Sequence, residues 1–247
     1  MNKKKIISSI FENLKTIVGA LIIAIIIRSL IIQPFYIPSS SMEPTLLIGD
    51  RIFVSKYTYG FSKHSFPFSP PFTNNRVNYK QPKQGDLVVF KTPADNRTDY
   101  IKRLIGLPGD EVQFIEGSIF INGVKINREK IRSNDKVRCG KFLLKVNTYM
   151  ETLPNGSKHI AVYSNVGTMK NTQKFKVPKD HFFLMGDNRD CSRDSRFLDS
   201  VGYVNYVNLV GKAQIIFFSN DTVKGSLLKF WNLNNSFRFD RTFNKLK

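Results

Sequence analysis

Three segments of the chain contain residues whose types could support catalysis. Residues 37–46 are rich in serine and flanked by proline, residues 99–110 contain a lysine in apolar surroundings, and residues 185–196 alternate aspartate with arginine. A serine hydroxyl is a poor nucleophile until a nearby base accepts its proton. Together these residue types could supply a nucleophile, a base and charged support.

The lysine of the second segment is the most suggestive of these residues. Lys102 is surrounded in sequence by Ile101, Leu104 and Ile105. Burial among such neighbours penalises the charged amine and lowers its pKa, so that it can act as a base. Each segment also has an ordinary interpretation: a linker after a helix, a lysine pointing into water, and a surface loop of ion pairs.

Several other kinds of active site are not indicated. The chain has no His-Glu-x-x-His, Gly-x-Ser-x-Gly, Walker or Gly-x-Gly-x-x-Gly motif. Its histidines, His64, His159 and His181, are scattered, which argues against a Ser-His-Asp triad. Cys139 and Cys191 are too few for a Cys-rich zinc site or a disulfide framework, and whether they form one bridge stays open.

Taken together and in this order, the three segments resemble the bacterial type I signal peptidases, or leader peptidases, which use a Ser-Lys dyad. The resemblance extends over most of the chain. It includes Gln33-Pro34-Phe35, residues 83–90, residues 151–156 and residues 208–213.

The resemblance assigns the chemistry to two residues. It implies that Ser41 is the nucleophile and Lys102 the general base, which later acts as an acid toward the leaving amine. It places the Ser41 backbone N–H and the Ser39 hydroxyl in an oxyanion hole. No cofactor and no metal are implied.

The resemblance also implies supporting residues around the dyad. Ser192 matches a serine that orients the lysine, and charged residues match a supporting shell. Those charged residues are Asp187, Arg189, Asp194 and Arg196. The chain departs from the family pattern at Ser40, where many members have glycine, and at Cys191, where relatives commonly have asparagine.

The resemblance implies an endopeptidase that removes N-terminal signal peptides from exported preproteins. Such enzymes cut after small-x-small sites, and shallow apolar pockets exclude larger side chains. The residues at the matching substrate-binding positions are Phe35, Ile37, Pro38, Met42, Leu46, Tyr100 and Ile101. The implied partners are preproteins, membrane lipid and the translocation machinery, and nucleic acid is not expected.

An N-terminal membrane anchor, residues 1–33, is predicted to position these segments. Residues 16–32 would form about 25 Å of helix, near the lower limit for a membrane span, with Arg28 near its outer end. No Ala-x-Ala-like cleavage site follows, which argues against a removed signal. The lysines at 3–5 predict a cytoplasmic N-terminus and a catalytic domain on the periplasmic side of the cytoplasmic membrane.

The rest of the chain, residues 34–247, is predicted to be mainly β. Its apolar runs are short, β-branched and bounded by turn signals such as Asn122-Gly123. The expected strands are 51–54, 86–90, 111–115, 118–121, 142–146, 159–163 and 211–218. We expect a catalytic core of about 34–111 and 180–247, with an inserted accessory β region at about 112–179.

The aromatic and proline-rich stretch from Phe61 to Tyr79 is predicted to be a loop. It contains Phe66, Phe68 and Phe72. It could rest in the membrane interface beside the anchor or fold onto its own core, and the sequence favours neither.

Two alternatives to the signal peptidase remain, one suggested by the charge and one by the dyad. The chain has 38 Lys+Arg and 19 Asp+Glu, a formal net charge of +19, which would suit a membrane-tethered module binding anionic lipid or nucleic acid. A related Ser-Lys processing peptidase, of the self-cleaving repressor or pilus type, would share the dyad.

Overall fold

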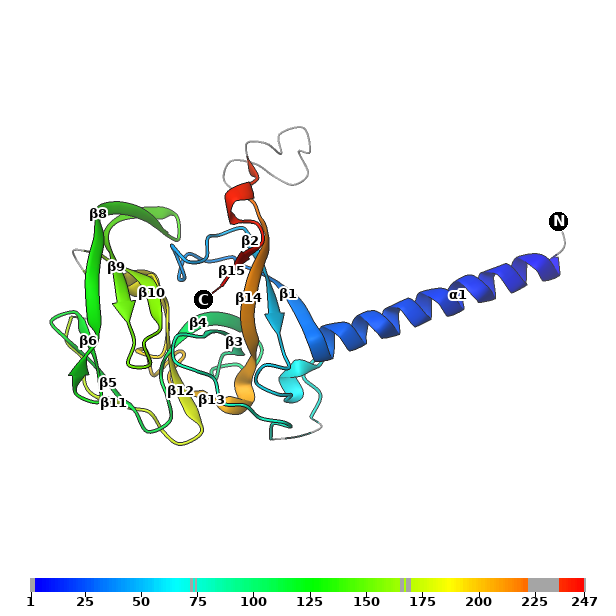
Figure 1. Ribbon diagram of the computed structural model, residues 1–247. Coiled ribbons are helices and arrows are strands. Elements are labelled where there is room, and N and C mark those ends of the chain that lie inside the picture. The colour runs from blue at the N-terminus through cyan, green and yellow to red at the C-terminus, as the bar shows by residue number, and fades with distance from the viewer. Residues whose placement is uncertain are drawn as a thin grey trace.

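A 24-residue helix, α1 (Lys3–Ile26), projects from a domain built almost entirely of β-strands in the computed structural model (Figure 1). The structure describes residues 3–71, 73, 75–164, 167, 170–221 and 236–246. The expected mainly β fold behind one N-terminal apolar helix is confirmed.

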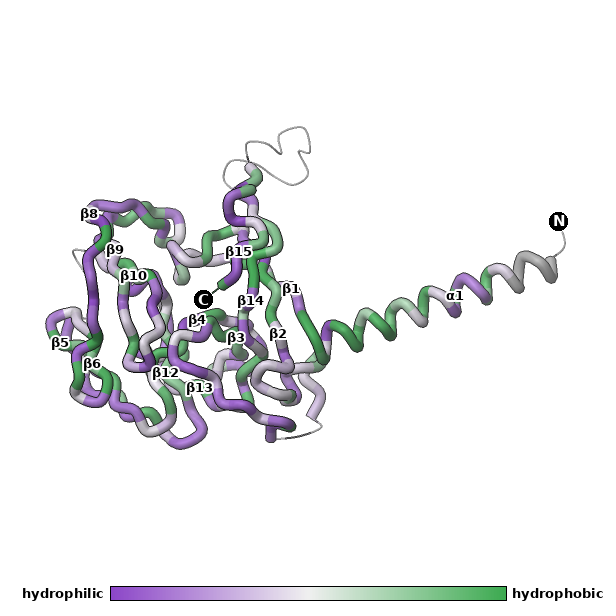
Figure 2. Tube along the Cα trace, viewed as in Figure 1, coloured by the Kyte–Doolittle hydropathy of each residue, from purple (hydrophilic) through white to green (hydrophobic). Residues whose placement is uncertain are grey.

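The helix continues into a π-helical turn, η1 (Ile27–Ile31), and leads directly into the first strand. Residues Ser9–Ile31 form a candidate membrane span of 23 residues, and only 6% of its most apolar window is buried by the protein. Figure 2 shows the apolar residues continuing along this helix to the domain. The span is therefore longer than the predicted 16–32, because the helix starts well before the densest apolar run.

The largest sheet positions the three segments that could support catalysis. In the described part of the chain its strand order is β1-β2-β14-β3-β4-β12-β13, with β15 paired to β14. Its strands are β1 (Ile32–Tyr36), β2 (Asp50–Ser55), β3 (Leu87–Lys91), β4 (Asp99–Gly106), β12 (His181–Met185), β13 (Val204–Asn205), β14 (Leu209–Ser219) and β15 (Asn244–Lys245).

Two smaller sheets come from the middle of the sequence. One has the order β10-β9-β8 and the other β11-β5-β6-β7. Their strands are β5 (Glu111–Ile115), β6 (Ser118–Ile121), β7 (Val124–Lys125), β8 (Asn127–Cys139), β9 (Phe142–Thr152), β10 (Lys158–Ser164) and β11 (Phe175–Lys176). Figure 1 shows these sheets at the end of the molecule opposite α1.

The turn chemistry read from the sequence explains one hairpin directly. Asn122 and Gly123 have φ of 53° and 78°, and they join β6 to β7 where Ile121 pairs with Val124. Two consecutive positive φ values match the twist of a tight hairpin, and Asn-Gly tolerates them best. This predicted turn is confirmed.

Each expected strand is present, and others had weak sequence signals. β1 contains Pro34, which is unusual within a strand, and it pairs only with β2. β8 is mostly polar because nearly all of its residues are exposed or half-buried and it pairs only with β9. Neither has the alternation that identifies a half-buried strand.

The aromatic loop, residues 61–79, is partly folded onto the domain and partly exposed. Its short 3-10 helix η2 (Lys63–Ser65) buries His64 and Ser65, whereas the Phe68 side chain is fully exposed at 104%. Phe72 lies outside the described residues.

Packing of the large sheet against the β5–β6 hairpin depends on buried aromatic residues. Phe183 of β12 is 0% exposed and its ring centroid lies 5.1 Å from that of Phe175 in β11. We expect Phe183→Ala to lower the free energy of unfolding by about 3–5 kcal/mol, because it removes apolar contacts and leaves a cavity.

The matched control is Phe142→Ala, since Phe142 is 76% exposed and should change stability by less than about 0.5 kcal/mol. Urea unfolding of the full chain in a mild detergent measures both variants. Equal effects would contradict the assigned core.

Candidate active site

The hydroxyl of Ser41 and the amine of Lys102 lie within hydrogen-bond distance. Lys102 Nζ is 2.6 Å from Ser41 Oγ, although the two residues are 61 positions apart. Ser41 lies in the turn after β1, and Lys102 lies on β4 opposite Val88 of β3. The large sheet thus brings together the two residues that the resemblance singled out.

The Lys102 amine is buried in the protein interior. The residue is only 4% exposed, and burial lowers its pKa to about 8, although Asp194 and Asp187 act in the opposite direction. An amine with this pKa is largely deprotonated in mildly alkaline solution. Lys102 can therefore accept a proton from the adjacent hydroxyl.

The serine turn is fixed by the loop that follows β12. The Asn188 backbone N–H donates to the Ser41 carbonyl at 3.1 Å, and its side-chain amide donates to the Ser40 carbonyl at 3.1 Å. Gly186 permits this approach, because a Cβ there would lie 2.4 Å from the Ser41 carbonyl oxygen and 2.3 Å from Ser192 Oγ. The position of Ser41 is thus set by hydrogen bonds to the backbone carbonyls of the serine turn.

A buried ion pair lies beneath Lys102. Arg103 is the next residue on β4. Its Nε donates to Oδ1 of Asp187 at 2.8 Å, and its Nη2 donates to Oδ2 at 2.8 Å. Burial alone would raise the pKa of Asp187, but Arg103 outweighs burial and holds it below its usual value. The Thr45 hydroxyl also donates to this carboxylate at 2.6 Å, which connects it to the serine turn.

The other three charged residues form two further buried pairs. Arg196 donates through Nε and Nη2 to Asp194 at 2.8 and 2.9 Å. Arg189 donates to Glu151 of β9 at 3.1 and 2.6 Å, so it connects the loop to a smaller sheet. Two-point contacts of this kind fix orientation as well as charge.

The remaining serines have different surroundings. Ser39 Oγ lies 3.3 Å from Ser41 Oγ. Ser192 Oγ is buried and has no hydrogen-bond partner among the described residues, so the structure does not form the bond to Lys102 that the resemblance implies. The orienting role of Ser192 stays a prediction.

The two cysteines form a disulfide, a pairing that the sequence left open. Cys139 at the end of β8 is bonded to Cys191 in the loop after β12, across 52 positions. The neighbouring Gly140 N–H donates to Ser40 Oγ at 3.3 Å. The β8–β9 hairpin is therefore covalently attached beside the serine turn.

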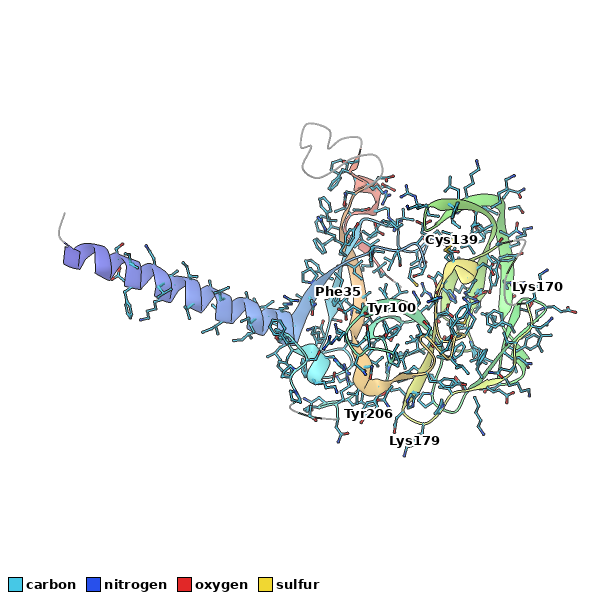
Figure 3. The ribbon with its side chains drawn as sticks, turned by 180° about the vertical axis from the view of Figure 1, so that it is seen from behind. Phe35, Tyr100, Cys139, Lys170, Lys179 and Tyr206 are labelled. Atoms are coloured by element: carbon cyan, nitrogen blue, oxygen red, sulfur yellow. A yellow bond between two sulfur atoms is a disulfide. The ribbon has the colours of Figure 1, made fainter. Side chains whose placement is uncertain are left out.

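A cavity of about 630 Å³ opens onto Ser41 and Lys102. Six of the seven predicted substrate-binding residues line it: Phe35, Ile37, Pro38, Met42, Tyr100 and Ile101. Leu46 does not, because its side chain is 0% exposed and belongs to the core under β1 and β2. Its substrate-binding role stays a prediction that the cavity does not support. Figure 3 shows Phe35 and Tyr100 on neighbouring parts of the domain near α1.

Several residues at the site were not predicted from the sequence. The cavity is also lined by Tyr36, Ile48, Ile52, Val89, Thr98, Asp99, Gly140, Cys191 and Arg193. Arg103 and Glu151 were not identified as ion-pair partners. The position of Arg103 beside the apolar Leu104 and Ile105 in β4 was the available signal, since a charged residue that is buried there needs a partner.

Comparisons with known proteins identify the family of this chain. Residues 10–218 match the family model described as signal peptidase, peptidase S26. The chain belongs to this signal peptidase family. Signal peptidase I from Rickettsia typhi is 42% identical over 207 residues, which cover 80% of this chain and 76% of that protein. Signal peptidase I from Rickettsia massiliae is 39% identical over 241 residues, covering 91% and 88%.

A solved structure of a signal peptidase I from Enterococcus faecalis is 23% identical, covers 54% of this chain and 97% of that one, and has a TM-score of 0.33. Family membership rests on the sequence matches. The chain is accordingly a membrane-anchored serine peptidase, a hydrolase that removes signal peptides. The basic binding module is not supported as the main function.

The Asp187–Arg103 pair should be important for stability. We expect Asp187→Asn to lower the free energy of unfolding by about 3–5 kcal/mol, because Arg103 would remain buried without a counter-charge. Since the pKa of Asp187 is depressed in the folded state, its contribution is present above the unfolded pKa and is lost as pH falls through the folded one.

The control is Glu111→Gln. Glu111 forms a salt bridge to Lys174 at the surface, where the exposed fractions of the two side chains are 35% and 63%. Urea unfolding at neutral pH compares the two variants. An Asp187→Asn effect no larger than that of Glu111→Gln would contradict the structural role.

Proposed function

We propose that this signal peptidase cuts preproteins through a Ser41 nucleophile and a Lys102 general base. The observation that carries the proposal is the 2.6 Å contact between Ser41 Oγ and a buried amine with a pKa of about 8. In this mechanism Lys102 takes the Ser41 proton as Oγ attacks the scissile carbonyl. The protonated amine then gives that proton to the leaving amine as the peptide bond breaks.

Water completes the cycle. After the mature protein leaves, Lys102 removes a proton from water, and the hydroxide attacks the Ser41 ester. The proton returns to Ser41 when the signal peptide departs, so both residues are regenerated.

The developing oxyanion needs donors that are already in position. We assign these to the Ser41 backbone N–H and the Ser39 hydroxyl. The proximity of Ser39 Oγ to Ser41 Oγ, at 3.3 Å, supports this assignment.

The substrate is proposed to add as an extended strand along β4. β12 pairs with β4 from Arg103 onward, whereas residues 99–102 pair with β3 alone among the described strands, and their other edge has no strand partner there. A peptide there can form main-chain hydrogen bonds while alternate side chains enter the cavity. The apolar Ile37, Met42 and Ile101 suit the small side chains of an Ala-x-Ala-like site.

We also propose the topology and partners. The lysines at positions 3–5 favour a cytoplasmic N-terminus, which puts the catalytic domain on the periplasmic side of the cytoplasmic membrane. Preproteins emerging from the translocation machinery are the proposed partners. The anchor would hold the dyad near the membrane surface, where their cleavage sites emerge.

The dyad is tested by substitution. Ser41→Ala and Lys102→Ala should each lower kcat/KM for an Ala-x-Ala preprotein by at least about 10³-fold, because nucleophile and base act as a unit. Single-turnover cleavage by the full chain in detergent gives the measurement.

Ser133→Ala and Lys136→Ala are matched controls, since both residues are exposed on β8 with a Ser-x-x-Lys spacing. Wild-type rates in Lys102→Ala would rule out the proposed base. Unchanged cleavage in EDTA is expected, and its loss would exclude the metal-free mechanism.

The pH dependence reports the state of the lysine. Because a base must be deprotonated, kcat/KM should increase as pH rises and should level off above a pKa of about 8. Stopped assays across this range, with the Lys136→Ala control, provide the profile. Full activity well below pH 8, where the amine is protonated, would contradict the mechanism.

A further inference from the structure

A second cavity, of about 610 Å³, lies where α1 meets the domain. It is bordered by Arg28 of η1, by β1, by the aromatic loop and by the β3–β4 loop. Figures 1 and 3 both show the short helix η2 of the aromatic loop beside the domain end of α1. Among the described residues, Phe35 and Asp99 line this cavity as well as the active-site cavity.

Positive charge is in excess in this second cavity. Its lining includes Arg28, Lys63, Lys91 and Arg97 against two carboxylates, those of Asp95 and Asp99, and these two are already engaged. Asp99 pairs with Lys91 at 2.9 Å. Asp95 accepts from the Arg97 and Thr98 backbone N–H groups at 2.9 and 3.0 Å.

The other three cations have no carboxylate partner in the part of the chain that the structure describes. Neither Arg28, Lys63 nor Arg97 forms a salt bridge there, although protein carboxylates are the usual counter-ions of such groups. They therefore form a positive surface without an internal counter-ion.

Neighbouring titratable groups respond to this concentration of charge. Burial, followed by the charges of Arg28 and Lys91, lowers the pKa of Lys56 to about 8. Burial, followed by Lys63 and Lys91, lowers the pKa of His64 to about 4. An anion in the cavity would relieve this repulsion.

The membrane anchor sets the depth of the cavity. Arg28 belongs to the candidate span Ser9–Ile31, so the cavity borders the end of this span, and the ends of a membrane span are where a bilayer has its headgroups. Beside it, the Phe68 side chain is fully exposed at 104%, and Phe66 and Pro67 also line the cavity. Aromatic side chains favour this boundary between water and hydrocarbon.

We propose that this cavity binds the phosphodiester headgroup of an anionic phospholipid. Lys63 and Arg97 contact the phosphate, Arg28 approaches it from the membrane side, and the Phe66–Phe68 segment rests at the acyl-chain boundary. Occupancy holds the aromatic loop against the membrane next to the active-site cavity. The proposal concerns a site outside the dyad and does not depend on the peptidase mechanism.

Native mass spectrometry of the full chain tests the proposal. The protein is released from detergent micelles that contain equal amounts of phosphatidylcholine and phosphatidylglycerol. Wild type should retain one phosphatidylglycerol in preference to phosphatidylcholine. The double variant Lys63→Gln/Arg97→Gln should bind phosphatidylglycerol about 25-fold more weakly, because each cation near the membrane surface contributes about a fivefold factor.

The matched control is Lys136→Gln/Lys145→Gln, which removes two exposed cations that face each other on β8 and β9. It should retain phosphatidylglycerol like the wild type. Thermal unfolding of both double variants verifies that each is folded before lipid binding is compared.

Soluble phosphate compounds are tested as competitors in separate arms of the experiment. Inorganic phosphate and glycerophosphoglycerol should displace the lipid only weakly, since neither supplies acyl chains for the Phe66–Phe68 segment. Displacement by phosphate at equal concentration would overturn the lipid assignment in favour of a soluble anion. Equal retention of the two lipids, or equal loss in both double variants, would overturn the site itself.

Discussion

The structure depends on keeping one lysine amine out of water beside a serine hydroxyl. Burial of Lys102 costs free energy when the amine is charged, and this cost is what makes it a base. Two buried carboxylates near the amine, Asp187 and Asp194, would restore its charge if they acted alone. Burial outweighs them and Arg196 adds to its effect, so the amine keeps a pKa of about 8, while Arg103 and Arg196 occupy the carboxylate oxygens.

This constraint explains why the β10-β9-β8 sheet lies against the site. Arg189 reaches from the catalytic loop to Glu151 of β9, and the Cys139–Cys191 disulfide attaches the β8–β9 hairpin to the same loop. Tyr163 of β10 donates to Glu151 at 2.5 Å and adds a further contact. The loop that holds Ser41 is thereby fixed by all three strands of the β10-β9-β8 sheet, and fixed geometry lets a weak nucleophile and a weak base act together.

The membrane enters the architecture through the connection between α1 and β1. Because the π-turn η1 leads into β1 without a linker, the strand that follows the helix directly is also the one that carries Phe35 into the active-site cavity. The position of the anchor therefore constrains where the active-site cavity lies relative to the end of the candidate span. A cationic cavity beside the helix gives the same face a second way to contact lipid.

The sequence alone determined the features encoded in short stretches of residues. The apolar helix, the β-rich remainder, the Asn122-Gly123 turn and the segments holding Ser41 and Lys102 all have local signals. Helix length, strand alternation and turn propensity act over a few residues, so they can be read without a fold. The strand β8 had no such signal because one-sided pairing left most of its side chains in water.

Only the tertiary structure decided which distant residues meet. It paired Arg103 with Asp187 and Arg189 with Glu151, joined Cys139 to Cys191, and put Leu46 in the core when the resemblance had put it in the groove. It also placed Arg28, Lys63 and Arg97 around one cavity. Charge pairing and burial are properties of the three-dimensional neighbourhood, and strand order across the sheet, which fixes that neighbourhood, has no local signature in the chain.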